Sequence, residues 1–357
     1  MSIYIDFHVL QTVPPSCVNR DDTGSPKTAV YGGAVRARVS SQAWKHAMRE
    51  DFKSLFTAED RAIRTKAVTD MIIAEMRKID DTLDDAMYLG KAKAALEAAG
   101  IALDKENDKA KALFFISNRQ AKALAECALT LDFKSKDAKK QCENALKDNP
   151  SIEIALFGRM VAGATTLNCD AAAQVAHAIS THAVHNEYDY FTACDDLQKE
   201  DNAGAGHLGT VEFNSSTLYR YANVNATELA KTIGTEKVAV AIAKFGQAFI
   251  HSMPTGKENT FANRTLPDAV YVTLRSDQPV NLCGAFEQPV KPSNEGFAVP
   301  SEKKLASYAK TVYEKFAVRP VAEWCVSSEF GTSVKSCTLP DLLTELETAI
   351  ASAIGEE

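Results

Sequence analysis

Residues 32–49 read GGAVRARVSSQAWKHAMR, and the spacing of their apolar residues changes partway along. Up to residue 39 the apolar residues alternate with Arg36 and Arg38, which predicts a strand with one basic face. Ser40 is a favoured N-cap residue. Beyond it the apolar residues recur at three- and four-residue spacing, which is typical of an amphipathic helix. The stretch therefore predicts a strand that runs directly into a capped helix.

This strand-to-helix junction has the composition of an anion-binding site. Paired glycines precede it and permit close approach of the backbone, and a helix N-terminus offers N–H groups and a favourable dipole. Ser40 and Gln42 can add neutral hydrogen bonds, while Lys45 and Arg49 lie one turn apart. These features suit the holding of successive phosphates. A solvated helix face after a surface strand explains the same residues equally well, so both interpretations stay open here.

The rest of the chain predicts strands and helices in mixture, so the expected fold class is α+β. At the N-terminus Ile3, Ile5, Phe7 and Val9 alternate with polar residues, which is typical of a half-buried strand. Residues 59–150 are rich in Ala, Lys, Glu and Asp and predict a helical insertion. Further strands are expected at 217–224 and 268–274, and further helices at 171–184, 227–253, 301–316 and 339–354.

Composition and charge narrow the possible functions. The 357 residues carry a formal charge of −7, yet residues 16–49 contain six basic and two acidic side chains. A basic face on an acidic body suits a protein that binds one polyanion and stays soluble. The eight cysteines form no C-x-x-C pair, which argues against a zinc ribbon or a thioredoxin-like site. With no apolar run of bilayer length and no visible secretory signal, we expect a cytoplasmic protein without membrane contact.

No catalytic motif is recognisable in the sequence, and we expect no enzyme activity, no bound metal and no cofactor. Asp21 and Asp22 could hold a metal ion for phosphodiester cleavage, but a turn with local salt bridges explains them more simply. His182 and His185 could share a helix face while His177 points elsewhere. Such a histidine pair is usually structural, so it does not predict a metal site.

Two further segments could contact a nucleic acid. Tyr188, Tyr190 and Phe191 precede a polar, glycine-rich stretch at residues 195–209 that predicts an exposed arm, and aromatic residues beside such an arm can stack on bases. They could equally be the last core residues before the chain leaves the body. Lysines gather between residues 134 and 147 and could contact DNA phosphates, although a solvated helix face is the usual explanation.

The residues of several motifs, and the order of these motifs along the chain, resemble those of the CasC family, the RNA-binding backbone subunits of type I-E CRISPR Cascade complexes. These motifs span most of the chain in the family's order. The insertion resembles that of the family in its helical character but not residue by residue. The matching stretches are residues 8–10, 15–22, 32–49, 158–160, 176–182, 189–193, 195–198, 207–213, 219–223 and 284–287.

This resemblance implies a modified RRM-like (ferredoxin-like) palm with a helical fingers insertion and a β-hairpin or loop thumb. Copies are expected to stack along one CRISPR RNA beside other Cascade subunits, and target DNA pairs with that guide. Each thumb crosses the RNA held by its neighbour and turns one base outward. The expected bounds are 1–58, 171–186 and 214–357 for the palm, 59–170 for the fingers and 187–213 for the thumb.

The resemblance also implies the residues of the site. At the kinked base the thumb residues are Tyr190, which stands where the family often has tryptophan, together with Phe191, Thr192 and Leu208. Lys136, Lys139 and Lys140 are the nearest equivalents of a lysine-rich finger helix that touches target DNA. The residues expected to bind RNA are Arg20, Lys27, Arg38, Ser40, Gln42, Lys45, Arg49, Arg159 and Met160.

Two other functions fit the same sequence. Related backbone subunits of type III complexes cut target RNA with a loop aspartate, and Asp22 lies in a comparable loop. A metal-dependent endoribonuclease is therefore the enzymatic alternative. The other alternative is a generic RRM-like single-strand RNA-binding protein, which would not form filaments whose length follows the RNA.

Overall fold

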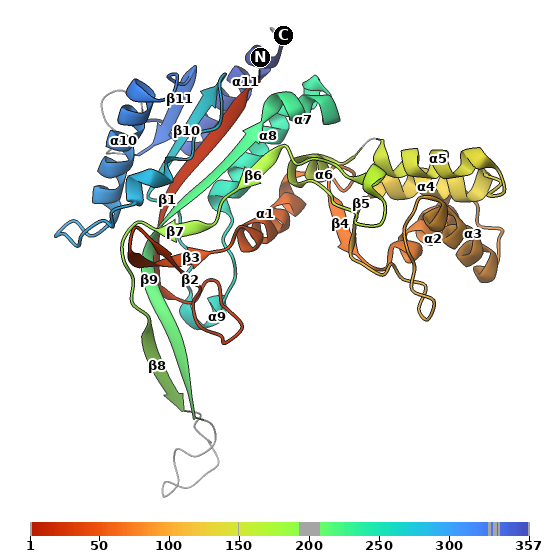
Figure 1. Cartoon of the computed structure of the whole chain (residues 1–357), viewed down its shortest axis with the longest axis horizontal. Coiled ribbons are helices and arrows are strands. Elements are labelled where there is room, and N and C mark those ends of the chain that lie inside the picture. Colours follow the sequence, from red (N-terminus) through yellow and green to blue (C-terminus); the bar gives the residue numbers. More distant parts are fainter. Residues whose placement is uncertain are drawn as a thin grey trace, which may run out of the picture. The chain divides into compact units, whose positions relative to one another are not determined.

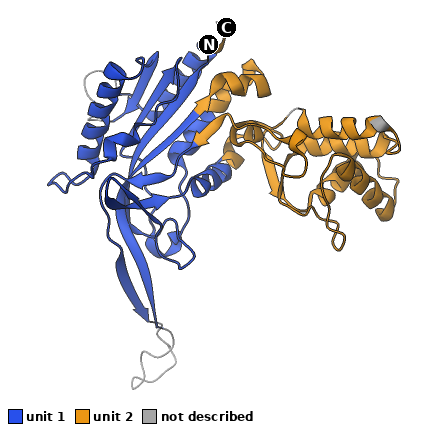
Figure 2. Cartoon of the chain, in the orientation of Figure 1, with its two compact units in different colours: residues 1–51, 175–223, 243–353 blue, residues 52–174, 224–242, 354–357 orange. Residues whose placement is uncertain are grey.

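The computed structural model describes residues 2–148, 150–192, 208–327, 330, 334 and 336–355 (Figure 1). The chain folds into two compact units (Figure 2). Most of the arm expected at residues 195–209 lies outside the described residues. Unit 1 comprises residues 1–51, 175–223 and 243–353, and unit 2 comprises residues 52–174, 224–242 and 354–357.

A sheet with strand order β11-β10-β1-β9-β7-β3-β2 forms the centre of unit 1. The pairs β1–β10, β10–β11, β2–β3, β3–β7 and β7–β9 are antiparallel, and β8 pairs with β9 as an antiparallel hairpin. The strands are β1 (Tyr4–Ser16), β2 (Thr28–Tyr31), β3 (Ala34–Val39), β7 (Ala178–Ser180), β8 (Glu187–Thr192), β9 (Leu208–Asn225), β10 (Ala269–Arg275) and β11 (Ala322–Val326).

Helices cover both faces of this sheet, which confirms the expected α+β class with an RRM-like palm. On one face Phe7 packs against Phe245 and Phe249 of α8, with ring centroids 5.9 and 6.4 Å apart. On the other face Tyr219 of β9 and Leu305 of α10 belong to one buried cluster. The helical elements that lie wholly or partly in unit 1 are α1 (Ser41–Leu55), α8 (Thr235–His251), α9 (Glu258–Phe261), η3 (Leu282–Phe286), α10 (Ala298–Lys315) and α11 (Leu339–Gly355).

Burial on both faces corrects the expectation that β1 is half buried. Asp6 and His8, which the alternation assigned to solvent, are fully buried. Asp6 Oδ1 accepts a hydrogen bond from the Tyr221 hydroxyl at 2.7 Å and Oδ2 accepts one from Val280 N at 3.0 Å, while His8 Nδ1 lies 2.9 Å from the Tyr219 hydroxyl. Desolvation raises the pKa of Asp6 to about 6 and lowers the pKa of His8 to about 3. The polar side of β1 therefore faces a hydrogen-bonded layer.

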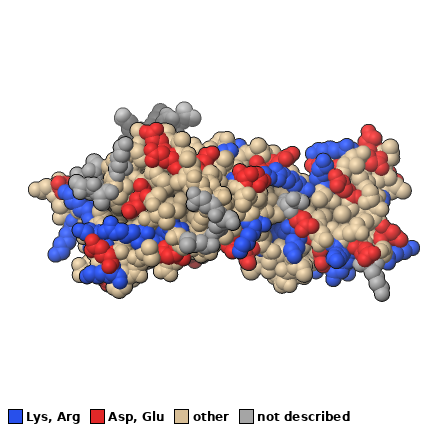
Figure 3. Space-filling view, turned by 90° about the horizontal axis from the view of Figure 1, so that it is seen from above, with Lys and Arg blue, Asp and Glu red and all other residues tan. Residues whose placement is uncertain are grey.

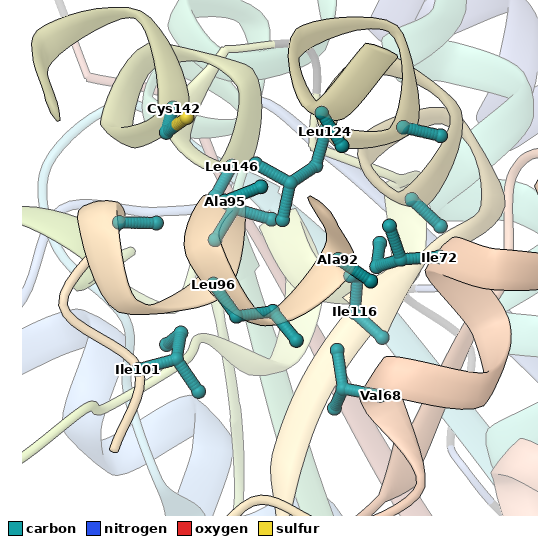
Figure 4. Close-up of a cluster of buried hydrophobic side chains, with 14 of the residues drawn as sticks. Val68, Ile72, Ala92, Ala95, Leu96, Ile101, Ile116, Leu124, Cys142 and Leu146 are labelled. Atoms are coloured by element: carbon teal, nitrogen blue, oxygen red, sulfur yellow. The ribbon is translucent and has the colours of Figure 1, made fainter. Parts of the chain in front are cut away.

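Unit 2 is mainly helical and has its own apolar core (Figure 4). Val68 and Ile72 of α2, Leu96 of α3, Leu124 of α4 and Leu146 of α5 meet in it. The insertion expected at residues 59–170 lies within unit 2, which also takes in residues 224–242. Its elements are β4 (Ala62–Thr65), α2 (Val68–Ile79), α3 (Asp85–Ala98), β5 (Phe114–Ser117), α4 (Asn118–Thr130), α5 (Lys136–Lys147), α6 (Ile152–Phe157), η1 (Thr165–Leu167), β6 (Ala173–Val175) and α7 (Ala226–Ile233).

Two of the predicted helices are wrong. Residues 171–184 contain the short strands β6 and β7 instead of a helix, because β7 pairs with β3 and β9. The helix predicted at 227–253 is interrupted at Gly234, whose φ of 85° ends α7 before α8 begins. Among the described residues, no helix combines the length and the apolar composition that crossing a bilayer requires.

Candidate nucleic-acid interface

A hydrogen-bonded loop brings four of the expected RNA-binding residues together. Asn19 Oδ1 accepts a hydrogen bond from Ser40 N at 2.9 Å, and Asn19 O accepts one from Lys27 N at 2.8 Å. Lys27 O in turn accepts one from Arg38 N at 2.9 Å. Arg20 follows Asn19 directly and is exposed. The loop is thus fixed against β3 and the start of α1, where Arg20, Lys27, Arg38 and Ser40 meet.

The charges of this loop act on a neighbouring imidazole. Arg38 NH1 donates a hydrogen bond to His177 Nδ1 at 3.2 Å, and Arg38 Nε donates one to Thr28 O at 3.2 Å. The pKa of His177 is lowered, first by burial and then by the charges of Arg38 and Lys27. Two cations therefore lie close together beside a neutral ring, as an anion-binding surface requires.

A buried cation–π contact holds α1 on the sheet. Trp44 is fully buried, and the guanidinium carbon of Arg220 lies 3.7 Å from the centroid of its ring. Arg220 donates hydrogen bonds to Gln11 Oε1 at 2.6 Å and to Phe249 O in the last turn of α8, where the helix dipole favours a cation. Burial lowers the pKa of Arg220 to about 9. The anchored helix has one fixed orientation on the palm.

The opposite side of α1 carries the remaining expected phosphate ligands. Gln42 is exposed, and Lys45 and Arg49, one turn apart, are half-buried. Ser40 Oγ accepts a hydrogen bond from Ala43 N at 3.3 Å, which confirms the predicted N-cap. Hydrogen-bond donors at the helix start and cations further along it form one stripe that continues the basic loop.

The paired glycines serve a different purpose from the one expected. A Cβ on Gly32, whose φ is 58°, would lie 1.6 Å from Glu287 O, so the close approach is to the protein's own carbonyl. The Tyr31 hydroxyl donates to Cys283 O at 3.4 Å beside it. Gly33 has a φ of 73° but no atom within 4 Å of an added Cβ. The turn between β2 and β3 is therefore docked on the segment around η3.

The prediction that Arg36 lies on an exposed basic face of β3 is wrong. Arg36 is fully buried and donates hydrogen bonds to Ser180 O and Phe286 O, both at 2.8 Å. Val35, expected on the buried side, is exposed. Of the two arginines in the strand, only Arg38 is accessible to a ligand, and Arg36 ties the hairpin to the palm.

Asp21 closes the turn that carries Arg20. Its Oδ1 accepts hydrogen bonds from Thr23 N at 2.9 Å, Thr23 Oγ1 at 2.7 Å and Ser25 N at 3.0 Å. The pKa of Asp21 is lowered, chiefly by the hydroxyl of Thr23. Asp22 is exposed on the same turn. In the described part of the chain, no three His, Cys, Asp or Glu side chains are grouped so that they could hold a metal ion.

The three histidines that were considered as metal ligands have different surroundings. His182 is buried, with its ring centroid 3.6 Å from that of Phe297, and its Nε2 accepts a hydrogen bond from Thr217 N at 3.1 Å. His185 is exposed, and His177 contacts the basic loop. The helix face that would have joined His182 to His185 does not exist, because this segment is not helical.

The β8–β9 hairpin projects from the sheet of unit 1 (Figure 1), and its two faces differ. Directly paired residues share a face, and the side alternates along each strand. Phe191 lies on the opposite face from Tyr190, with its ring 2.4 Å from where a Cβ on Gly209 would be. The pairing thus divides the expected thumb residues. Tyr190, Thr192 and Leu208 share one face of the hairpin, together with Tyr188, and Phe191 lies on the other.

Arg159 and Met160 of unit 2 have opposite environments. Arg159 is buried, and its guanidinium donates hydrogen bonds to Phe115 O at 3.1 Å, Leu146 O at 2.7 Å and Leu167 O at 3.0 Å. These bonds argue against the direct RNA contact that the resemblance implied for Arg159. Met160 is 87% exposed. The buried arginine therefore anchors the loop that presents Met160.

The lysine-rich segment forms α5 of unit 2. Lys136 is the first residue of this helix and follows the N-cap Ser135. Lys139 and Lys140 are exposed, and Lys139 Nζ lies 3.8 Å from Glu143 Oε1. A contact between these lysines and DNA stays a prediction. In Figure 3 basic and acidic side chains are interspersed on the face shown, so charge alone does not mark a binding surface there.

An RRM-like palm with a basic strand-to-helix junction, a helical insertion and a projecting hairpin defines this protein as an α+β protein whose palm carries a cluster of basic side chains. The chain belongs to the Cas_CT1975 family, the CT1975-like proteins, whose model matches residues 5–349. It is 31% identical to a chain of a "CRISPR RNA-guided surveillance complex, pre-nicking", with a TM-score of 0.82, covering 97% of this chain and 100% of that one. It is 28% identical to a chain of another "CRISPR RNA-guided surveillance complex", with a TM-score of 0.64 and coverage of 97% and 99%. No curated protein matches the sequence.

Proposed function

We propose that this protein is a CRISPR-RNA-binding backbone subunit of a type I-E Cascade complex in the cytoplasm. Family membership and the likeness to chains of RNA-guided surveillance complexes support this proposal. The single observation that carries it is the loop in which Asn19 joins Lys27 and Ser40, so that Arg20, Lys27 and Arg38 meet at the capped start of α1.

The palm binds the RNA backbone and leaves the bases available for pairing with target DNA. Arginine and lysine side chains contact phosphates without reading sequence. Ser40 and Gln42 add hydrogen bonds to the same strand. This division of roles suits a subunit that must accept any guide, because sequence recognition then comes from base pairing alone.

Several copies stack along one guide beside other Cascade subunits. The β8–β9 hairpin acts as the thumb that crosses the RNA of the neighbouring copy, and Met160 packs beside the base that the thumb displaces. A repeated head-to-tail contact generates an open array whose length follows the RNA. The lysines of α5 would then contact target DNA.

The direct test is to purify the protein from its host and sequence the RNA that accompanies it. Transcripts that contain CRISPR repeats and spacers are the expected result. A heterogeneous set of cellular RNAs would identify a generic single-strand RNA-binding protein instead.

Lys45→Ala and Arg49→Ala are expected to weaken RNA binding to a similar degree for all sequences. Each removes one phosphate contact, so the slope of log K against log salt should fall by about 0.7 per substitution. Filter binding across a salt series measures this slope, with Lys310→Ala on α10 as a control outside the interface. Unchanged slopes in both variants would show that α1 does not touch the RNA backbone.

We further propose that the protein binds RNA without cutting it. Asp22→Asn is accordingly expected to leave a complementary RNA strand intact to the same extent as the wild type in the presence of Mg²⁺. Gel analysis of the assembled complex with labelled RNA measures this. Metal-dependent cutting by the wild type that Asp22→Asn abolishes would establish the endoribonuclease alternative.

A further inference from the structure

The short helix α9 lies beside both the basic loop, residues 17–27, and the root of the β8–β9 hairpin (Figure 1). The ring of Phe261, the last residue of α9, packs against the ring of Phe213 in β9, with centroids 5.9 Å apart. Just before α9, Gly256 lies so close to the loop that a Cβ there would be 2.1 Å from Val18 O. One segment therefore contacts both the basic loop and the hairpin.

The segment around α9 is held in place independently of the hairpin. Its contact with the basic loop fixes the N-terminal end. At the C-terminal end, Thr265 O accepts a hydrogen bond from Gln11 Nε2 at 2.9 Å, and Thr265 Oγ1 donates one to Thr12 O at 2.8 Å. Lys257 and Ala262, which flank α9, both have a φ of 48°, which is uncommon for residues other than glycine. A backbone kept in such a conformation is fixed by its surroundings, so α9 can act as a fixed support.

The support from α9 reaches one face of the hairpin. Phe213 belongs to the pair of residues at the hairpin root. Because side chains alternate along a strand, Phe213 lies on the same face as Phe191 and on the face opposite to Tyr188 and Tyr190. These two tyrosines are exposed. The apolar face of the hairpin that is available to a partner is therefore the one that α9 does not contact.

Side-chain hydrogen bonds stiffen the root of the hairpin. Asn214 Nδ2 donates a hydrogen bond to Asn186 Oδ1 at 3.0 Å, and Asn186 Nδ2 donates one to Glu212 Oε2 at 3.0 Å. Asn214 is buried. Such pairs across two strands stabilise their association. Because the two strands are joined in this way at the root, a contact at Phe213 sets the direction of the whole hairpin.

We propose that α9 positions the thumb, because the contact of Phe261 with Phe213 fixes the direction of the β8–β9 hairpin relative to the basic loop. This inference rests on the proposed function, in which the hairpin of one copy crosses the RNA that the next copy holds. In a head-to-tail array every copy repeats the same offset, so a change of direction accumulates along the RNA. Phe261 is thus a positioning residue for assembly, and it acts through the hairpin.

The first measurement tests the direction of the hairpin in the full-length protein without RNA. Spin labels are attached through unnatural amino acids, since the chain has eight cysteines of its own. They replace Asp22 in the basic loop and Asp189 on the hairpin, which are both exposed. Pulsed electron paramagnetic resonance gives the distribution of distances between them. We expect a narrow distribution without further substitution, a broadened or shifted one with Phe261→Ala, and a narrow one again with Phe261→Leu, which keeps an apolar contact.

The second measurement compares an RNA that holds one copy with an RNA that holds several. Phe261→Ala should bind the short RNA with the affinity and salt slope of the wild type, because its phosphate contacts are intact. On the long RNA it should lose the additional affinity that cooperative assembly provides, and electron micrographs should show irregular arrays. Phe316→Ala removes the same ring from a residue that is 81% exposed after α10, and this matched control should change neither result.

Phe213→Ala removes the same contact from the hairpin side and should reproduce both effects. Both rings are half-buried, and circular dichroism establishes that each variant is folded. An unchanged distance distribution in the two folded alanine variants overturns the positioning role. A broadened distribution together with regular arrays also overturns the proposal, because the direction set by α9 would then not matter for assembly. Failure of the wild type to bind RNA overturns the proposed function instead, while the distances still decide whether α9 fixes the hairpin.

Discussion

Gly32→Ala is expected to lower the free energy of unfolding by about 2–5 kcal/mol and to weaken RNA binding. Its new Cβ would lie 1.6 Å from Glu287 O, so either the hairpin or the segment around η3 must move. Forcing an extra methyl group into a packed site costs about 1–3 kcal/mol, and the left-handed backbone adds about 1–2 kcal/mol for any residue with a Cβ. Displacement of the hairpin would also carry Lys27 and Arg38 away from the start of α1.

Gly33→Ala provides the matched control. Its φ of 73° imposes a similar backbone penalty, but no atom lies within 4 Å of the added Cβ. We therefore expect a loss of only about 1–2 kcal/mol and near-normal RNA affinity. Urea denaturation and filter binding of both variants measure the difference. Equal losses of stability in the two variants would show that docking on Glu287 contributes nothing.

Local sequence signals predicted the strand and the helix of the candidate interface because these parts are adjacent in the chain. The strand, the Ser40 cap and the amphipathic helix follow one another within 18 residues, and spacing alone predicts each of them. The structure adds the contact from Asn19 to Ser40, which no spacing rule contains. Because of that contact, the basic residues of the loop lie close to those of β3 and the start of α1.

The alternation pattern wrongly assigned three buried polar residues to the surface, because the partners that bury them are distant in sequence. Alternation assigned Asp6, His8 and Arg36 to solvent, as it does for a sheet covered on one side. Their partners lie more than 200 residues away in the chain, such as Tyr221 of β9 for Asp6 and Phe286 of η3 for Arg36. Residues 171–184 failed similarly, since pairing of β7 with two strands overrides an Ala-rich, helix-favouring composition.

Roles assigned residue by residue from the resemblance also group neighbouring residues that the structure separates. They group Arg159 with Met160, although burial separates them, and they group Phe191 with Tyr190, although strand alternation places them on opposite faces of the hairpin. Consecutive residues of a strand point to opposite faces of the sheet, so neighbouring numbers do not imply a shared role. The hairpin faces can therefore be tested separately.

The triple variant Tyr188→Ala, Tyr190→Ala, Leu208→Ala is expected to fold normally and to lose cooperative assembly on RNA. These side chains are 68%, 64% and 58% exposed, so they add little to the stability of unit 1. Substitutions at exposed positions usually change stability by less than about 0.5 kcal/mol. Together they form an apolar face on a projecting hairpin, and such faces mark interaction sites. In a head-to-tail array one face must contact the next copy.

Electron microscopy with a long single-stranded RNA and binding isotherms measure the loss. Wild-type protein should give regular arrays and a steep isotherm, whereas the triple variant should bind RNA as separate copies with a shallow isotherm and lower apparent affinity. Val318→Ala, at a residue 65% exposed outside the hairpin, is the control. Phe191→Ala should have a milder effect, because that ring packs on Gly209 within its own hairpin and lies on the other face. Regular arrays from the triple variant would exclude this face of the hairpin as the contact between copies, and would leave the Phe191 face as the part of the thumb that reaches the neighbouring RNA.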